Sequence, residues 1–229
     1  VLPRVDQILA KYVEALGGEQ ALRRVSSRHI VATRDIPTGP GGVDPMSSSA
    51  ELYQKAPNLT MNVYRTATFS IADGFDGTTA WARNMAGVVT TPPMPDRERV
   101  RRAADFYEPL DLRREYTRLA VSAIEKVMGR DVYVVTGYFE DDLPERLYFD
   151  VESGLLVRKA TTLPTAVGLS PFEVTYEDYR PGPSGVRVPW VIRMTPAGPR
   201  TEIATSSTLR IQKVEEGVPL ADDLFLRPR

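Results

Sequence analysis

Residues 90–116, TTPPMPDRERVRRAADFYEPLDLRREY, are predicted to be helical, although the sequence on both sides of them has the pattern of short strands. The proline-rich residues 90–95 lead into a segment with acidic residues near its start, which is typical of the first turn of a helix. We expect one helix over residues 96–107, ended by Glu108-Pro109, and a shorter helix over residues 110–116. The apolar face of the first helix comprises Val100, Ala103, Ala104 and Tyr107. A helical insertion midway through a series of strands is therefore the main architectural prediction.

The N-terminal segment also has a helical pattern. Its apolar residues recur at the spacing i, i+3, i+4, i+7, which places them on one face of a helix. They are Val5, Ile8, Leu9, Tyr12, Val13 and Leu16. Gly17-Gly18 ends this helix, and residues 19–25 are predicted to form a second, shorter one. We expect the first helix to cover the core, although a lid or docking helix would have the same pattern.

Strand patterns begin at His29. Leu59, Met61 and Val63 alternate with polar residues, as in a strand with one buried face. Two turn dipeptides follow, Asp73-Gly74 and Asp76-Gly77, and each predicts a tight connection between strands.

The second half of the chain is again a series of strands. Residues 132–139 are apolar on both faces, which predicts a central strand that is covered on both sides. The turn residues at 151–154 and 181–185 predict two hairpins. Leu224-Phe225, near the end of the chain, is expected to tuck into the core. Residues 38–49, rich in Gly, Pro and Ser, are predicted to be a mobile loop.

The composition limits the classes of function. The chain has 229 residues, 42% hydrophobic and 26% charged, which predicts a single globular domain over residues 1–229. The formal net charge of −1 gives no global attraction to nucleic acid or to an anionic membrane. There is no cysteine, so disulfides, thiolate zinc sites and covalent c-type haem attachment are excluded.

The expected location of the protein follows from two further features. No apolar run approaches the roughly 20 residues that are needed to cross a bilayer. The sequence begins at Val1 rather than Met. We expect that a secretory signal was removed or lies outside this sequence, and that the protein is periplasmic.

No catalytic, cofactor-binding or metal-binding residues are predicted. His29 is the one histidine of the sequence and follows Ser26 and Ser27, but no G-x-S-x-G motif exposes a serine nucleophile. A hydrogen-bonded histidine at a strand edge is the preferred interpretation. The acidic residues 140–142 and 222–223 are adjacent along the chain, so they point in different directions and are interpreted as solvated turns.

The predicted helix over residues 96–107 carries a cluster of arginines, interleaved with acidic residues. We predict that Arg97, Arg101 and Arg102 are largely left to water, because the apolar face covers the sheet. They form either a salt-bridged solvated face or a docking surface for an acidic partner protein.

Large apolar residues occupy strand positions from which their side chains could point to the inside of the curved sheet. The candidates for lining a hydrophobic ligand site are Met61, Phe69, Trp81, Phe172 and Trp190. Simple core packing is the competing interpretation of the same pattern.

Motifs distributed over nearly the whole chain resemble those of one group of bacterial envelope proteins. They are ALGG at residues 15–18, QKAP at 54–57, GFDGTTAW at 74–81, YFD at 148–150 with SGLLVR at 153–158, YEDYR at 176–180 with GVRVP at 185–189, and LF at 224–225 with Pro228. The chain resembles the lipoprotein-sorting carriers of the LolA/LolB type. It resembles more closely a periplasmic domain found with, or fused to, c-type cytochromes of the photosynthetic reaction-centre cytochrome-subunit kind.

This resemblance implies a strongly curved antiparallel sheet, or half-open β-barrel. Its N-terminal helix and mid-chain helical insertion would fill the concave side. We expect Trp81 and Trp190 to be buried on that side, because both occupy apolar positions of alternating strands.

Two functions follow as expectations. The first is a non-enzymatic periplasmic accessory subunit that docks on a c-type cytochrome or photosynthetic reaction centre. The alternative is a carrier of lipoprotein acyl chains or another hydrophobic ligand. A carrier needs a connected apolar pocket of roughly 300 Å³ or more, which makes the cavity the discriminating observation.

Overall fold

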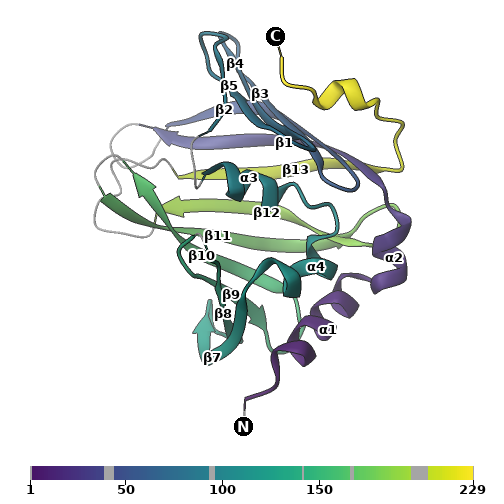
Figure 1. The fold of residues 1–229 in the computed structure, drawn as a ribbon, viewed down its shortest axis with the longest axis vertical. Coiled ribbons are helices and arrows are strands. Elements are labelled where there is room, and N and C mark those ends of the chain that lie inside the picture. Colours follow the sequence, from purple (N-terminus) through teal and green to yellow (C-terminus); the bar gives the residue numbers. More distant parts are fainter. Residues whose placement is uncertain are drawn as a thin grey trace.

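The structure of the chain, a computed structural model, is built on one curved antiparallel sheet with α-helices along one of its faces (Figure 1). It describes residues 2–38, 44–92, 96–140, 142–165, 168–196 and 206–228. Within these residues, thirteen strands lie in the order β6-β5-β4-β3-β2-β1-β13-β12-β11-β10-β9-β8-β7, and the sheet does not close. The predicted curved sheet with an N-terminal helix and a mid-chain helical insertion is therefore confirmed.

The elements alternate as the sequence indicated. The helices are α1 (Val5–Leu16), α2 (Glu19–Arg24), α3 (Asp96–Ala103), α4 (Glu108–Glu115) and the short 3-10 helix η2 (Asp222–Phe225). The strands are β1 (Ser27–Thr38), β2 (Asp44–Lys55), β3 (Leu59–Arg65), β4 (Ser70–Asp76), β5 (Ala80–Arg83), β6 (Val89–Thr90), β7 (Arg118–Val127), β8 (Arg130–Tyr138), β9 (Glu145–Asp150), β10 (Leu156–Thr165), β11 (Gly168–Pro181), β12 (Arg187–Pro196) and β13 (Ser207–Glu216).

The strand order explains why the helical insertion lies where it does. Strands β1 to β6 follow one another from the middle of the sheet to one edge, and β7 begins at the opposite edge. The chain then returns strand by strand until β13 pairs with β1, with Arg28 opposite Glu216. Helices α3 and α4 are therefore the connection between the two edges, and they cross one face of the sheet to make it.

The bounds of the two insertion helices differ from the prediction. Helix α3 ends at Ala103, not at residue 107, and the carboxylate of Asp105 accepts the Tyr107 backbone N–H at 2.9 Å in the turn that follows. Helix α4 begins at Glu108. Pro109, which was interpreted as a helix terminator, instead occupies the first turn of α4, where its missing N–H costs no hydrogen bond.

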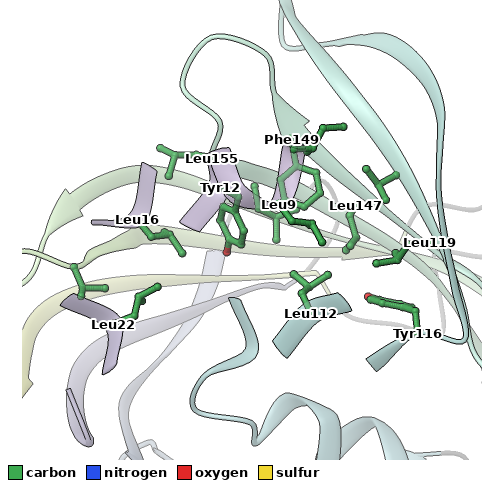
Figure 2. Packing of buried hydrophobic residues seen from close by; sticks show 14 of the residues in the cluster. Leu9, Tyr12, Leu16, Leu22, Leu112, Tyr116, Leu119, Leu147, Phe149 and Leu155 are labelled. Carbon is green, nitrogen blue, oxygen red and sulfur yellow. The ribbon is translucent and has the colours of Figure 1, made fainter. Parts of the chain in front are cut away.

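We call the face that contacts α1, α3 and α4 the inner face, and the opposite one the outer face. The largest core cluster joins α1, α2 and α4 to the inner face of β7–β10 (Figure 2). Tyr12 of α1 packs edge-on against Phe149 of β9, with ring centroids 5.3 Å apart. Leu112 of α4 and Leu147 of β9 are fully buried in the same cluster. Full burial of such side chains contributes roughly 1.5–3 kcal/mol each, so this cluster anchors the helices over the sheet.

The outer face of β3–β5 has a core of its own, which includes Trp81. Gly74 is the cross-strand neighbour of both Met61 and Trp81. The C-terminal segment covers them, because η2 contacts β3 and β4 and the Trp81 indole N–H donates to the Phe225 carbonyl at 3.0 Å. Trp81 is therefore buried as predicted, but on the outer face and not on the concave side. Phe225 is fully buried, which confirms the predicted tucking of the tail.

Gly74 also corrects a predicted turn, since it lies inside β4. A β-carbon there would stand 2.5 Å from the Thr60 carbonyl oxygen and 2.8 Å from the Trp81 ring. The glycine is required by the close approach of the indole and not by a turn. The turn lies at Gly77, where φ is +92°.

Several other predictions have a definite outcome. The hairpins at 151–154 and 181–185 are confirmed, because they join β9 to β10 and β11 to β12. Strand β8 is covered on both faces, as predicted, but it lies next to the edge strand β7 and is not central. Residues 44–49 of the predicted loop belong to β2, and residues 39–43 lie outside the described residues.

Candidate ligand-binding cavity

Two cavities lie between the inner face and the helices. The first, which we call the α4 cavity, has a volume of about 370 Å³ and reaches Leu163, Phe172 and Val174 on β10 and β11. The second, the α1 cavity, has a volume of about 340 Å³ and is lined by α1, β12 and β13 among others. The residues that line both are Ala103, Glu108, Lys159 and Tyr176. The two cavities therefore meet at these residues, and each has the size of a small-molecule site.

An ion pair stands where the cavities meet. Alternation along β10 directs Lys159, Thr161 and Leu163 to the inner face, and the Lys159 ammonium pairs with the carboxylate of Glu108. Glu108 is the first residue of α4, where the helix dipole favours a negative charge. Burial alone would lower the pKa of Lys159, but the carboxylates of Glu108 and Glu145 outweigh it and raise the pKa. Lys159 is therefore a cation whose charge is already neutralised.

Tyrosines surround this ion pair. Burial raises the pKa of Tyr12 and raises that of Tyr176 to about 12, so both phenols are protonated at neutral pH. The Tyr116 hydroxyl donates to Glu145, and the Tyr179 hydroxyl donates to the Leu156 carbonyl at 2.8 Å. The cavities thus combine apolar walls with a few polar groups at their centre, as ligand sites commonly do.

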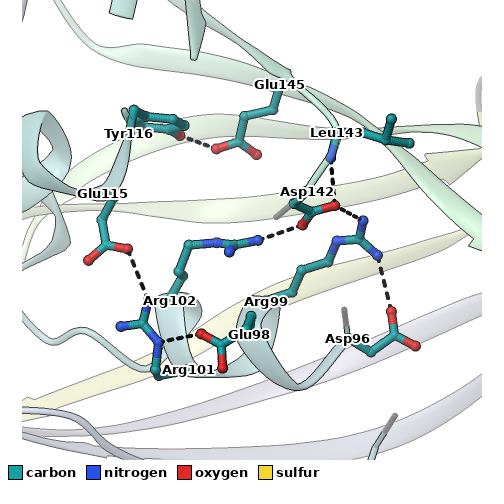
Figure 3. A network of polar contacts seen from close by, with 10 residues as sticks. All are labelled: Asp96, Glu98, Arg99, Arg101, Arg102, Glu115, Tyr116, Asp142, Leu143 and Glu145. Atoms are coloured by element: carbon teal, nitrogen blue, oxygen red, sulfur yellow. Dashed lines mark hydrogen bonds and ion pairs between the residues drawn. The ribbon is translucent and has the colours of Figure 1, made fainter. Parts of the chain in front are cut away.

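A second polar cluster borders the α4 cavity (Figure 3). The carboxylate of Asp142, whose side chain is 3% exposed, accepts hydrogen bonds from the guanidinium groups of Arg99 and Arg102. The Arg102 bond is 2.6 Å long, and Asp142 also accepts the backbone N–H of Leu143 at 2.8 Å. This network fastens α3 to the segment that precedes β9.

The predicted docking arginines do not share one environment. Arg102 was expected to face water, but its side chain is only 13% exposed because it pairs with Asp142 and stacks 4.0 Å from the Phe139 ring. Arg101 is paired with Glu98 at 2.8 Å and lies 3.7 Å from Glu115. Arg97 is exposed. Arg102 therefore binds Asp142 within the protein and does not face water as predicted. Docking through Arg97 and Arg101 stays a prediction.

The predicted ligand-lining residues are spread over both faces of the sheet. Phe172 lines the α4 cavity, and Phe69 lines a separate pocket beside β1–β5. Met61 and Trp81 belong to the outer-face core. Trp190 was expected to be largely buried, but it is partly exposed, and the Arg180 guanidinium lies 4.7 Å from its ring.

The polar centre of the cavities was not predicted from the sequence. Glu108, Lys159 and Tyr176 come from α4, β10 and β11, and no local motif links them. The one feature of the sequence that could have indicated this polar centre is Lys159, a lysine at a position of β10 where alternation predicts an apolar side chain. His29 was predicted to be a hydrogen-bonded histidine at a strand edge. The hydrogen bond is confirmed, because its Nδ1 lies 3.1 Å from the Glu215 carboxylate, and its ring stacks on Tyr53 with centroids 4.5 Å apart. The edge position is wrong, because β1 lies near the middle of the sheet.

Gly137 controls the position of Tyr116. The Tyr116 ring lies directly over Gly137 on the inner face of β8, where a β-carbon would overlap it. We expect Gly137→Ala to displace the ring from Glu145 and to lower the free energy of unfolding by about 1–3 kcal/mol, as overpacking does. Urea denaturation would measure the loss. An alanine variant with unchanged stability would show that the ring has room to move.

Among the described residues, no three histidine or carboxylate side chains converge as the ligands of a metal ion would. None of the helices described is long and apolar enough to span a membrane.

Known proteins resemble this chain in fold and hardly in sequence. No protein-family model matches it, and no curated protein does. A DUF1329 family protein from Desulfovibrio piger superposes with a TM-score of 0.65 at 13% identity, over 97% of either chain. A LolA superfamily protein from Nitrosomonas europaea gives a TM-score of 0.64 at 16% identity, over 98% of either chain. A domain from Vibrio parahaemolyticus, described as that of an outer membrane lipoprotein-sorting protein, gives a TM-score of 0.62 at 12% identity, over 95% of this chain and 97% of that one. The chain therefore has the LolA-like fold.

Proposed function

We propose that this protein is a non-enzymatic carrier of a hydrophobic ligand in the bacterial periplasm, acting as a single domain over residues 1–229. The observation that supports this most directly is the pair of adjoining cavities between the helices and the inner face. Both are larger than roughly 300 Å³, the size expected of a carrier pocket. The names of two proteins with this fold, a LolA superfamily protein and a lipoprotein-sorting domain, are consistent with such a role.

The charges around the cavities indicate what kind of ligand fits. The α4 cavity is lined by the cations Arg99, Arg102 and Lys159 and by the carboxylates Glu108, Glu115, Asp142 and Glu145. With four carboxylates against three cations, an additional negative charge would be repelled. The cavity therefore favours acyl chains on a neutral ester or amide group, such as those of a lipoprotein, over free fatty acids.

Docking on a cytochrome or reaction-centre complex has less support. The proteins compared above are not named for such complexes, and Arg102 is committed to Asp142. Docking therefore remains an alternative that rests on Arg97 and Arg101.

Binding of an uncharged fluorescent probe, N-phenyl-1-naphthylamine, would test the proposal. We expect the full chain to enhance its fluorescence, and Val174→Trp to reduce the enhancement, because the indole fills the α4 cavity and leaves only the α1 cavity open. Val191→Trp is the matched control, because Val191 lies on the outer face of the neighbouring strand, opposite Glu177. Thermal unfolding would verify that each variant is folded, and Leu163→Trp would replace Val174→Trp if the latter is not.

Two results would overturn the carrier proposal. One is a wild-type protein that does not enhance the probe's fluorescence. The other is equal binding by the wild type and by a folded variant whose α4 cavity is filled.

A further inference from the structure

A third cavity lies on the inner face, away from the helices. We call it the hairpin pocket, because strands β1 and β2 form one of its walls. Its volume is about 480 Å³, and it shares no lining residue with the α4 or α1 cavity. Its apolar lining includes Ile36, Met46, Phe69, Ile71 and Met85. Met46 and Met85 are 39% and 67% exposed, so apolar surface continues from the pocket to the protein surface.

Arg34 is the unusual group of this pocket. Its side chain lies on the inner face of β1, four residues from Ile30 of the α1 cavity, and its guanidinium stacks 4.8 Å from the Tyr64 ring. Its Nε is buried and has no hydrogen-bond partner. A buried donor without an acceptor is costly, and an anionic ligand that accepted this hydrogen bond would offset the cost.

Asp73 is the acidic side chain that lines the pocket, and it is only a weak counter-charge. Its carboxylate accepts a hydrogen bond from the Asn62 side-chain amide at 2.9 Å. Burial raises the pKa of Asp73, although Asn62 and Arg34 oppose the shift. Arg83 follows Trp81 by two residues in β5, so its side chain lies on the outer face, where its guanidinium donates to the Ser70 hydroxyl at 3.5 Å. Arg34 and Asp73 are therefore the charged side chains that face the pocket.

We propose that the hairpin pocket is a second ligand site, which binds a single-chain amphiphile with an anionic headgroup. The carboxylate or phosphate would pair with the Arg34 guanidinium, which offers several donors in a fixed plane. The alkyl chain would lie along Ile36, Met46 and Phe69 and leave the pocket past Met85.

Isothermal titration calorimetry of the full chain would test this site with three soluble amphiphiles of equal chain length. They are laurate, dodecyl phosphate and dodecyltrimethylammonium, each below its micelle concentration. We expect laurate to bind, and Arg34→Gln to weaken it about 10- to 100-fold, the usual value of a hydrogen bond to a charged group. Arg210→Gln is the matched control, because Arg210 is 51% exposed and lies opposite Val191 on the outer face. It should leave laurate binding unchanged.

The remaining comparisons separate this site from the carrier cavities. Val174→Trp should leave laurate binding intact, whereas Ile36→Trp should abolish it even if Arg34→Gln does not fold. Dodecyl phosphate binding at Arg34 would assign the site to anions in general, and binding of laurate alone would assign it to carboxylates. The proposal is overturned if dodecyltrimethylammonium binds as tightly as laurate, if folded Arg34→Gln binds laurate normally, or if Val174→Trp abolishes laurate binding.

Discussion

Replacing Trp81 with alanine should lower the free energy of unfolding by about 3–5 kcal/mol, the usual cost of truncating a buried aromatic side chain. The side chain is 1% exposed and packs with Val63 and Ala72 on the outer face. Its indole N–H also donates to the Phe225 carbonyl, so the variant loses a contact that holds the C-terminal segment. Urea denaturation followed by circular dichroism would measure the change.

Trp190→Ala serves as the comparison for this variant. Trp190 is partly exposed and stacks with Arg180, so we expect a loss of only about 1–2 kcal/mol. Equal losses for the two tryptophans would contradict the packing of the C-terminal segment over the outer face.

Asp142→Ala should destabilise the protein by about 3 kcal/mol, because it leaves two half-buried arginines without their common partner. Arg99 and Arg102 are 18% and 13% exposed, and both pair with this carboxylate. Asp96→Ala is the matched control. Asp96 is 51% exposed and pairs with Arg99 within one helix turn, so its loss should cost no more than about 0.5 kcal/mol.

The free energy of unfolding should fall in acid, because the carboxylate of Asp142 becomes protonated there. Burial alone would raise the pKa of Asp142, but the Leu143 N–H and the two arginines outweigh it and lower the pKa. A lowered pKa in the folded state means that the network contributes fully above the unfolded value of about 3.9 and is lost as the pH falls below it. Stability measured from pH 6 to pH 2 should therefore fall less steeply in Asp142→Ala than in the wild type. Parallel curves would show that the network does not titrate.

Local patterns in the sequence were sufficient to predict the type and order of the elements. The alternation around Met61 predicted a strand, and the spacing of Ile8, Leu9 and Tyr12 predicted α1, because each pattern depends on neighbours within a few residues. Alternation along a strand shows which residues share a face of the sheet, but it does not show which of the two faces the helices will cover. Trp81 was therefore placed on the wrong side, since both faces of β3–β5 bury apolar residues and a distant tail covers one of them.

The candidate site could be predicted only in part, because long-range pairing builds it. Phe172 was expected to line a cavity and does. The partner of Arg102, Asp142, lies 40 residues away. Glu108 and Lys159 are 51 residues apart, and three strands lie between them in the chain. Charges that meet across such distances have no signature in the sequence, so Arg102 looked like a solvated residue.

The junction between β1 and β13 has a consequence for how the chain folds. Within each half of the sheet, every strand pairs with its neighbour in the chain, whereas the Arg28–Glu216 contact closes a loop of 188 residues. Closing a loop of that length is slow compared with forming hairpins. We therefore expect two separate meanders to form first and to join last along β1 and β13. Until they join, β1 and β13 each leave one edge unpaired, so this junction is where a folding chain is most prone to aggregate or exchange strands with a second copy.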